Sequence, residues 1–131
     1  MRLLLASSSP RRRALLSLLV SDFESLAPDI NERPRTLEPP ADYVARLASE
    51  KAKTFAADQW VILGSDTTVA IGHDILGKPR DSQDAAAILR ALSGNTHEVH
   101  TAVALAYGDG IETVTCTTSV MFTELTDLSL I

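Results

Sequence analysis

The order of apolar and polar positions along the chain predicts an alternation of strands and helices. Compact apolar runs of a few residues are typical of buried strands, whereas apolar residues three and four positions apart mark one face of a helix. Residues 41–58 form the clearest helix, because their apolar side chains recur at helical spacing from Tyr43 to Phe55. The pattern also predicts helices over 11–20 and 82–92, and strands over 2–6, 23–27, 61–64, 69–71, 75–76, 97–106 and 112–122.

Turn and capping residues mark the boundaries between these elements. Ser9 is expected to cap a helix with Pro10 at its first position, because proline lacks the amide hydrogen that would be orphaned there. Glycines within 72–74 and 108–110 predict two hairpin turns, and Gly94 predicts a helix stop. Residues 29–40 hold three prolines and several charges, which predicts a loop.

Composition narrows the class of protein. A chain of 131 residues with 45% apolar residues fits one globular domain. The net charge of −5 leaves no global basic field to attract nucleic acid, so a polyphosphate site must be a local basic cluster. The single cysteine, Cys116, fits a reducing cytosol, and in its β-like run it is predicted to be a small buried apolar residue. The N-terminal apolar run is too short for a signal peptide and no stretch approaches a membrane span, so a cytoplasmic protein is expected.

A segment rich in serine and arginine follows the first predicted strand. Three serines, residues 7–9, precede a helix whose first turn holds Arg11, Arg12 and Arg13. Backbone amides at a helix N-terminus favour an anion, and hydroxyl and guanidinium groups add donors. Cations in a first turn oppose the helix dipole, a cost that an anionic ligand would offset. The residues alone leave a phosphate site and a solvated basic helix end equally open.

Asp66 follows the predicted strand over 61–64. This is the edge at which α/β sheets place ligands, and a carboxylate there can hold Mg²⁺ or act as a general base toward water. The alternative is a side chain that caps the strand end in a turn.

Four other charged residues also admit two interpretations. Lys78 stands between two turn residues, where it can neutralise phosphate charge or simply be a surface lysine. Arg46 and Lys51 lie on the long helix, where a solvated helix face is the alternative. Glu32 lies in the proline-rich loop, and by itself it is best interpreted as an exposed carboxylate.

The three histidines lack the spacing of metal ligands. His97 and His100 are three positions apart in a predicted strand, so they point to opposite faces, and His73 lies in a turn. They are predicted to be structural or peripheral.

Taken together and in order, these segments resemble the Maf nucleotide pyrophosphatases. The resemblance covers nearly the whole chain, and six motifs in the right order are far more specific than any one of them. The matching segments are Leu5-Ala6-Ser7-Ser8-Ser9-Pro10-Arg11-Arg12, Glu32, Arg46-Leu47-Ala48 with Lys51-Ala52, Gly64-Ser65-Asp66-Thr67, Gly77-Lys78-Pro79 and Leu92-Ser93-Gly94-x-x-His97-x-Val99-x-Thr101.

The resemblance implies an α/β fold, a Maf/ITPase-like mixed sheet with flanking helices and a central cleft, in a single Maf-like domain over residues 1–131. It implies an enzyme that splits a nucleoside triphosphate into a monophosphate and pyrophosphate with a divalent metal, usually Mg²⁺. The family's tendency to dimerise favours a homodimer. The implied role is house-cleaning of the nucleotide pool, and the family's older label is septum formation inhibition.

The resemblance also implies functional roles for individual residues. Asp66 matches the family's proton acceptor, which activates water for attack at the α-phosphorus. Glu32 matches an acidic position that helps with metal or water, so Glu32 and Asp66 are the expected metal residues. The residues expected to hold the triphosphate and offset charge on the leaving pyrophosphate are Ser7, Ser9, Arg11, Arg12, Lys51 and Lys78.

Two positions resemble the branch of the family that acts on dTTP and UTP. The branch that acts on 7-methyl-GTP typically has a tryptophan after the proline and a glutamine after the aspartate. Here these positions are Arg11 and Thr67, which by analogy are specificity positions that recognise the pyrimidine base of the substrate. The expected substrates are therefore dTTP, UTP and modified pyrimidine nucleotides, with 7-methyl-GTP as the alternative.

The chain departs from the family pattern at two places. Asn31 stands where many members carry an aspartate, which removes an auxiliary metal ligand. Residues 126–131 have the pattern of a helix start, and the C-terminal third of the family pattern does not follow. Its loss is expected to leave an unpaired sheet edge and exposed apolar surface.

Two classes of function therefore stay open. One is an active pyrophosphatase, and the other is a nucleotide-binding or septum-formation regulatory protein without turnover, because a site split across a missing segment loses its pre-organised geometry. A nucleic-acid binder is disfavoured, because the chain is acidic and offers no stacking platform.

Overall fold

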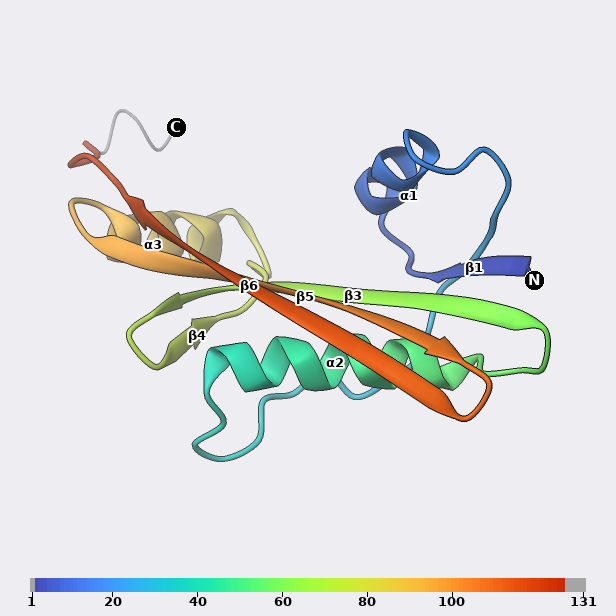
Figure 1. Ribbon diagram of the computed structural model, residues 1–131. Coiled ribbons are helices and arrows are strands. Elements are labelled where there is room, and N and C mark those ends of the chain that lie inside the picture. Colours follow the sequence, from blue (N-terminus) through green and yellow to red (C-terminus); the bar gives the residue numbers. More distant parts are fainter. Residues whose placement is uncertain (1, 127–131) are drawn as a thin grey trace.

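The computed structural model describes residues 2–126, which form a mixed sheet flanked by three helices (Figure 1). The sheet has the order β2–β1–β3–β5–β6, and β4 pairs with β3. β1 runs parallel to both of its neighbours, β2 and β3. The pairs β3–β4, β3–β5 and β5–β6 are antiparallel. The strands are β1 (Arg2–Ala6), β2 (Glu24–Leu26), β3 (Trp60–Ile71), β4 (Asp74–Leu76), β5 (Thr96–Tyr107) and β6 (Gly110–Met121).

The three helices take different places around the sheet. They are α1 (Pro10–Ser17), α2 (Pro40–Thr54) and α3 (Ser82–Leu92). α2 packs along the sheet against β1, β3, β5 and β6, and Figure 1 shows α1 and α3 near opposite ends of the sheet. The predicted mixed α/β sheet with flanking helices is confirmed.

The core lies between α2 and the middle of the sheet. Val44, Leu47 and Ala48 are completely buried, as the helical spacing of the sequence predicts. They pack against Leu4 of β1 and Ile62 of β3. Across from them β5 presents the alanines 102, 104 and 106, whose small side chains let a helix approach the strands closely.

The closest approach occurs at Gly64 in β3. A Cβ atom added there would lie 2.3 Å from the carbonyl oxygen of Ala48 and 2.8 Å from the amide nitrogen of Ala52. Both atoms belong to the backbone of α2. Glycine is therefore required at this position by helix–strand contact, because any side chain would force the two backbones apart.

β3 is one continuous strand, and here the sequence prediction is wrong. The pattern indicated separate strands over 61–64 and 69–71, with Asp66 in the connection between them. Instead, β5 pairs with β3 from Val61 to Ala70, which keeps the whole segment extended. Asp66 is therefore neither a residue beyond the strand end nor the cap of a turn. β1, however, pairs with β3 only as far as Gly64, so Asp66 lies just past the carboxyl end of the parallel strands.

Local signals at turns and caps are confirmed. The side chain of Ser9 accepts the amide hydrogen of Arg12 at the start of α1, with Pro10 in the first turn. Gly72, Gly94 and Gly108 all have positive φ angles, as turns and helix stops at these positions require. The predicted boundaries of α3 match the structure, whereas α1 and α2 end earlier than predicted, at Ser17 and Thr54.

Two predictions of burial are wrong. The apolar face predicted for the first helix is largely exposed, with Leu15, Leu18 and Leu19 open to solvent. Cys116 is exposed rather than buried, because nearly all side chains of β6 are accessible. Among the described residues β6 is an edge of the sheet, and its Val114 is also exposed.

The helix start predicted for residues 126–131 lies, apart from its first residue, outside the described residues. Within residues 2–126, no helix has the length and apolar character needed to cross a membrane.

Candidate active site

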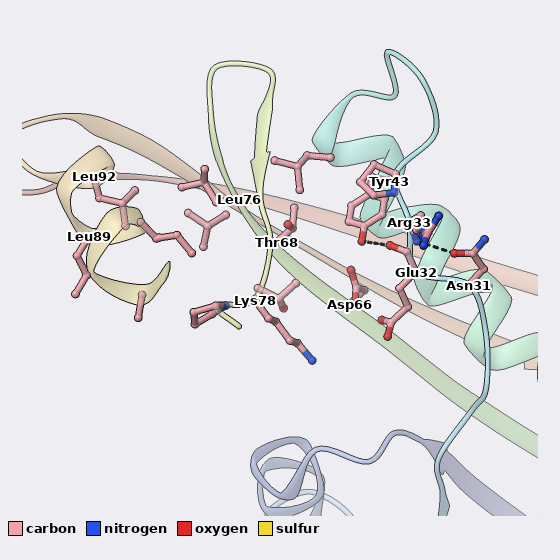
Figure 2. Close-up of a pocket in the computed structure, with 18 of the residues that line it drawn as sticks. Asn31, Glu32, Arg33, Tyr43, Asp66, Thr68, Leu76, Lys78, Leu89 and Leu92 are labelled. Carbon is pink, nitrogen blue, oxygen red and sulfur yellow. Dashed lines mark hydrogen bonds between the residues drawn. The ribbon is translucent and has the colours of Figure 1, made fainter. Parts of the chain in front are cut away.

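A cavity of about 1060 Å³ opens between α2, the loop before it, the β3–β4 hairpin and α3 (Figure 2). One end is polar and lined by Glu32, Asp66 and Lys78. The other end is apolar and is lined by Ile75, Leu76, Ile88, Leu89 and Leu92. The predicted central cleft is thus present, with an acidic and basic end joined to an apolar one.

Lys51 joins two carboxylates at the polar end. Its Nζ atom lies 3.0 Å from Oδ1 of Asp66 and 3.3 Å from Oε1 of Glu32. The side chains of Lys51 and Asp66 are only 10% and 11% exposed, whereas that of Glu32 is 52% exposed. A buried charge is costly unless it is paired, so the three groups stabilise one another as a unit. One ammonium faces two carboxylates here, and Lys78 in the cavity wall adds a second ammonium at this end.

The geometry of helix and strand explains why these groups meet. Tyr43, Leu47 and Lys51 are four residues apart, so they share the face of α2 that is turned to the sheet. Along β3 the side chains alternate, and Asp66 points to the same side as the buried Ile62. The reading of Lys51 as part of a solvated helix face is therefore wrong, because its side chain is buried against β3.

Thr67 and Asp66 point to opposite faces of the sheet, because they are neighbours in one strand. The hydroxyl of Thr67 lies 3.1 Å from that of Thr101 on β5. Thr67 nevertheless contributes to the cavity wall.

Lys78 follows β4 and contributes to the cavity wall from the side opposite α2. Figure 2 shows its side chain projecting from this segment, across the polar end from Asp66 and Glu32.

The serine and arginine segment directly follows β1, the strand that pairs with β3. Ser7 directly follows Ala6, which pairs with Gly64 two positions before Asp66. The Oγ atom of Ser7 accepts the amide hydrogen of Ser9 at 3.0 Å.

Of the predicted site residues, Glu32, Asp66, Thr67 and Lys78 line the cavity, and Lys51 contacts two of them. The predicted residues Ser7, Ser9, Arg11 and Arg12 do not line it.

Sequence reasoning missed the role of Tyr43. It was assigned only to the apolar face of the helix, yet its hydroxyl donates a hydrogen bond of 2.5 Å to the carbonyl oxygen of Glu32. Burial raises the pKa of this phenol, and the negative charges of Asp66 and Glu32 raise it further. The hydroxyl therefore stays protonated and remains a donor. The signal in the sequence is a tyrosine rather than a phenylalanine on a core face, because a buried hydroxyl usually has a hydrogen-bond partner.

The interpretation of Arg46 as part of a solvated helix face is also wrong. Its side chain is 15% exposed and makes two hydrogen bonds to the carboxylate of Glu38, at 2.7 and 2.8 Å. It also donates to the carbonyl oxygen of Arg33 at 3.1 Å and to Glu50 at 3.3 Å. The pKa of the guanidinium rises further above its usual range because of the bonds to Glu38.

The Arg46–Glu38 pair predicts a pH-dependent stability. Hydrogen bonds from Arg46 lower the pKa of Glu38 from 4.5 to about 2. The unfolded chain therefore binds a proton at Glu38 more tightly than the folded chain does. The ionised carboxylate stabilises the fold fully above pH 4.5 and loses that contribution as the pH falls toward 2. We expect the difference in free energy of unfolding between the wild type and Glu38→Gln to be constant near neutral pH and to shrink in acid. Urea titrations at successive pH values measure it, and a difference that does not change with pH would contradict the pairing.

The buried histidines lie apart from the cavity. His100 contacts Thr117 through Nδ1 at 2.8 Å and Glu98 through Nε2 at 3.0 Å. The ring of His97 packs edge-on against Phe122. Neither lines the cavity wall, in agreement with the predicted structural or peripheral role. Within residues 2–126, no group of three or more histidine, cysteine, aspartate or glutamate side chains gathers as a metal site.

Comparisons with known proteins agree with this architecture. A family model described as Maf-like protein matches residues 2–130. The dTTP/UTP pyrophosphatase of Hahella chejuensis is 51% identical over 131 residues, covering 96% of this chain and 65% of the relative. The dTTP/UTP pyrophosphatases of Shewanella oneidensis and Cereibacter sphaeroides are each 50% identical, and the chain covers 71% and 69% of their lengths. The chain thus spans about two thirds of the length of the curated relatives it matches.

Among solved structures, the Staphylococcus aureus Ham1 protein has a similar fold. It superimposes with a TM-score of 0.62 at 11% sequence identity, covering 91% of this chain and 70% of the Ham1 chain. At this low identity the likeness concerns the fold alone. It confirms the predicted Maf/ITPase-like architecture.

Proposed function

The chain belongs to the Maf family, and on this premise we propose that it hydrolyses nucleoside triphosphates, above all dTTP and UTP, to the monophosphate and pyrophosphate. Relatives that are about half identical and carry the name dTTP/UTP pyrophosphatase support this activity. The observation that carries the proposal is the Glu32–Lys51–Asp66 unit at the polar end of the cavity. The cavity has the size of a small-molecule site, for which volumes of about 300 to 1000 Å³ are typical.

In this proposal Asp66 is the general base. Its Oδ1 atom accepts the hydrogen bond from Lys51, and a carboxylate has further lone pairs with which to bind a water molecule in the cavity. Asp66 takes a proton from the water, the water oxygen bonds to the α-phosphorus, and the bond from the α-phosphorus to the bridging oxygen breaks. Pyrophosphate leaves with that oxygen. Lys51 holds the Asp66 carboxylate in place through this hydrogen bond.

The residues present fit a divalent cation. Glu32 and Asp66 each place a carboxylate oxygen within hydrogen-bonding distance of the same Nζ atom, so the two groups converge on one region. One or two carboxylates together with substrate phosphates are the usual donors for Mg²⁺. The ion supplies charge neutralisation on the phosphates when it is bound. Asn31 contributes no carboxylate, and its side-chain oxygen accepts the amide hydrogen of Arg33 within the loop.

Lys78 in the cavity wall, and the hydroxyl and basic groups at the start of α1, which lie outside that wall, are proposed to hold the triphosphate. Lys78 contributes an ammonium from the opposite wall, and Arg12 contributes a guanidinium from the start of α1. Ser7 and Ser9 accept backbone hydrogen bonds through their oxygens, which leaves their hydroxyl hydrogens to donate to phosphate. Arg11, with Thr67, is proposed to read the pyrimidine base.

The biological setting is part of the same proposal. We propose that residues 1–131 belong to one Maf-like domain that acts as a homodimer in the cytoplasm. The reaction would remove unwanted pyrimidine nucleotides from the nucleotide pool.

The test is to incubate the purified chain with Mg²⁺ and each of dTTP, UTP, CTP, GTP and 7-methyl-GTP, and to separate the products by chromatography. We expect monophosphate and pyrophosphate, formed fastest from dTTP or UTP. Diphosphate with inorganic phosphate would mean that a different bond is cut and would overturn the mechanism. Tight binding of dTTP by folded protein without any product would instead favour the nucleotide-binding regulatory role.

A further inference from the structure

The proposed metal residue Glu32 lies in a segment without regular secondary structure. Residues 27–39 connect β2 to α2 and contain neither helix nor strand. The carboxylate of Glu32 is half exposed, so burial does not hold it in place. A group that helps to bind a cation must nevertheless be held close to its productive position. Another interaction must therefore hold this part of the loop beside Lys51.

Two neighbouring side chains of α2 hold the backbone of the loop at this point. The hydroxyl of Tyr43 donates to the carbonyl oxygen of Glu32, and Nη2 of Arg46 donates to that of Arg33. The two side chains are three positions apart on the helix and therefore adjacent on its surface. The guanidinium of Arg46 lies 5.7 Å from the centre of the Tyr43 ring. Successive carbonyl groups are thus bound by adjacent donors.

Both donors are themselves rigidly held. The ring of Tyr43 belongs to the buried core beneath α2. Arg46 is fixed by its two hydrogen bonds to Glu38, whose side chain is only 9% exposed. Glu38 also accepts the amide hydrogen of Arg35, which ties the later part of the loop to the same guanidinium. The loop is therefore attached to the helix directly at two backbone positions and at a third through the side chain of Glu38, and its place does not depend on the exposed side chains.

We infer that Tyr43 and Arg46 are positioning residues, which hold the Glu32–Arg33 backbone so that the Glu32 carboxylate faces Lys51 and Asp66. The inference rests on the proposed function, because it assigns these residues to the cation site of that reaction. The hydroxyl of Tyr43 donates to the carbonyl oxygen of Glu32, so Tyr43 acts on the site through the loop backbone. Fixing the carbonyl oxygen of Glu32 restricts its own side chain to the region of the Lys51 ammonium, 3.3 Å away.

The variant Tyr43→Phe tests the inference, because it removes the donating hydroxyl and keeps the ring that packs in the core. The matched control is Tyr107→Phe, which alters the only other tyrosine, at the end of β5 and outside the cavity wall. The first measurement is hydrogen–deuterium exchange of peptides from 29–38. We expect faster exchange in Tyr43→Phe alone, while peptides from the middle of α2 stay unchanged. Unchanged exchange in the loop would overturn the inference, whether or not the protein hydrolyses nucleotides.

The second measurement separates a positioning role from a general loss of stability. The probe is Mn²⁺, titrated in the absence of nucleotide and followed by electron paramagnetic resonance. We expect Tyr43→Phe to weaken Mn²⁺ binding by roughly 10- to 100-fold, the usual effect of removing a group that orients a metal ligand. In a Glu32→Gln background the same substitution should have no further effect, because Tyr43 acts only through Glu32. An equal loss in both backgrounds would contradict the inference.

Turnover distinguishes failure of the inference from failure of the proposed function. If loop exchange and Mn²⁺ binding respond to Tyr43→Phe while no variant releases pyrophosphate, the positioning role stands and the hydrolase is wrong. With an active enzyme, we expect Tyr43→Phe to raise the Mg²⁺ concentration needed for half-maximal kcat. The KM for dTTP at saturating Mg²⁺ should stay near the wild-type value. Arg46→Lys should behave similarly, because an ammonium cannot reproduce the paired hydrogen bonds of the guanidinium to Glu38.

Discussion

Replacing Asp66 with asparagine is expected to lower kcat for dTTP by roughly 100- to 10 000-fold, the range typical of a lost general base. Asparagine has nearly the same shape and can still accept a hydrogen bond from Lys51, but its amide cannot take a proton from water. The substitution also leaves the Lys51 ammonium with Glu32 as its remaining carboxylate partner. At saturating Mg²⁺ the affinity for nucleotide should change far less than kcat, because the proposed contacts of the carboxylate are with the water and the cation and not with the base or ribose.

Release of pyrophosphate from dTTP measures this effect, with circular dichroism to confirm that the variant is folded. The matched control is Asp74→Asn, which changes an exposed carboxylate in β4, and it should keep wild-type activity. If Asp66→Asn retains a kcat close to that of the wild type, another group activates the water. The role proposed for the Glu32–Lys51–Asp66 unit would then be wrong.

The substitution Gly64→Ala is expected to lower the stability strongly, because an added Cβ meets closer atoms here than at any other glycine of the described chain. The new Cβ would lie 2.3 Å and 2.8 Å from backbone atoms of Ala48 and Ala52, and neither atom can rotate away. The helix and the strand must separate, and overpacking of this kind typically costs about 1 to 3 kcal/mol and sometimes more. Alanine also restricts the unfolded chain, but this opposing gain amounts to only about 0.4 to 1 kcal/mol.

Urea unfolding measures the loss, with Gly77→Ala as the matched control. A Cβ at Gly77 would meet no atom within 4 Å, so this variant should unfold near the wild-type midpoint. An unchanged midpoint for Gly64→Ala would mean that α2 and β3 do not pack as described. Activity should fall along with stability, because separating α2 from β3 also moves Lys51 away from Asp66.

Much of the local structure follows from short-range signals in the sequence. The first strand and the α3 helix have the predicted boundaries, because a compact apolar run and a capped amphipathic pattern each specify one element. Ser9 caps α1, and Gly72 and Gly108 form the turns, because each requirement concerns only the backbone of a few consecutive residues. The motif order also indicated the family before any geometry was known.

Errors arose where a distant segment decides the outcome. The connection proposed at 65–68 is extended because β5, far along the chain, pairs with it. The sequence pattern indicated a solvated helix residue at Arg46, but the loop before α2 places Glu38 against its side chain. Cys116 is exposed because among the described residues no element packs on β6 strongly enough to bury it. None of these outcomes has a local signature.

The amino-acid sequence by itself determined most of the elements, the cap of α1, the turns at Gly72 and Gly108 and the residue types of the candidate site. Only the tertiary structure decided which of those residues meet. Lys51 and Asp66 are 15 positions apart, and Tyr43 and Glu32 are 11 apart, so periodicity within one element relates neither pair. The packing of α2 on β3 brings the first pair together, and Gly64 permits that packing. Contacts of this kind depend on the distance between two backbones, which the burial of the whole core determines.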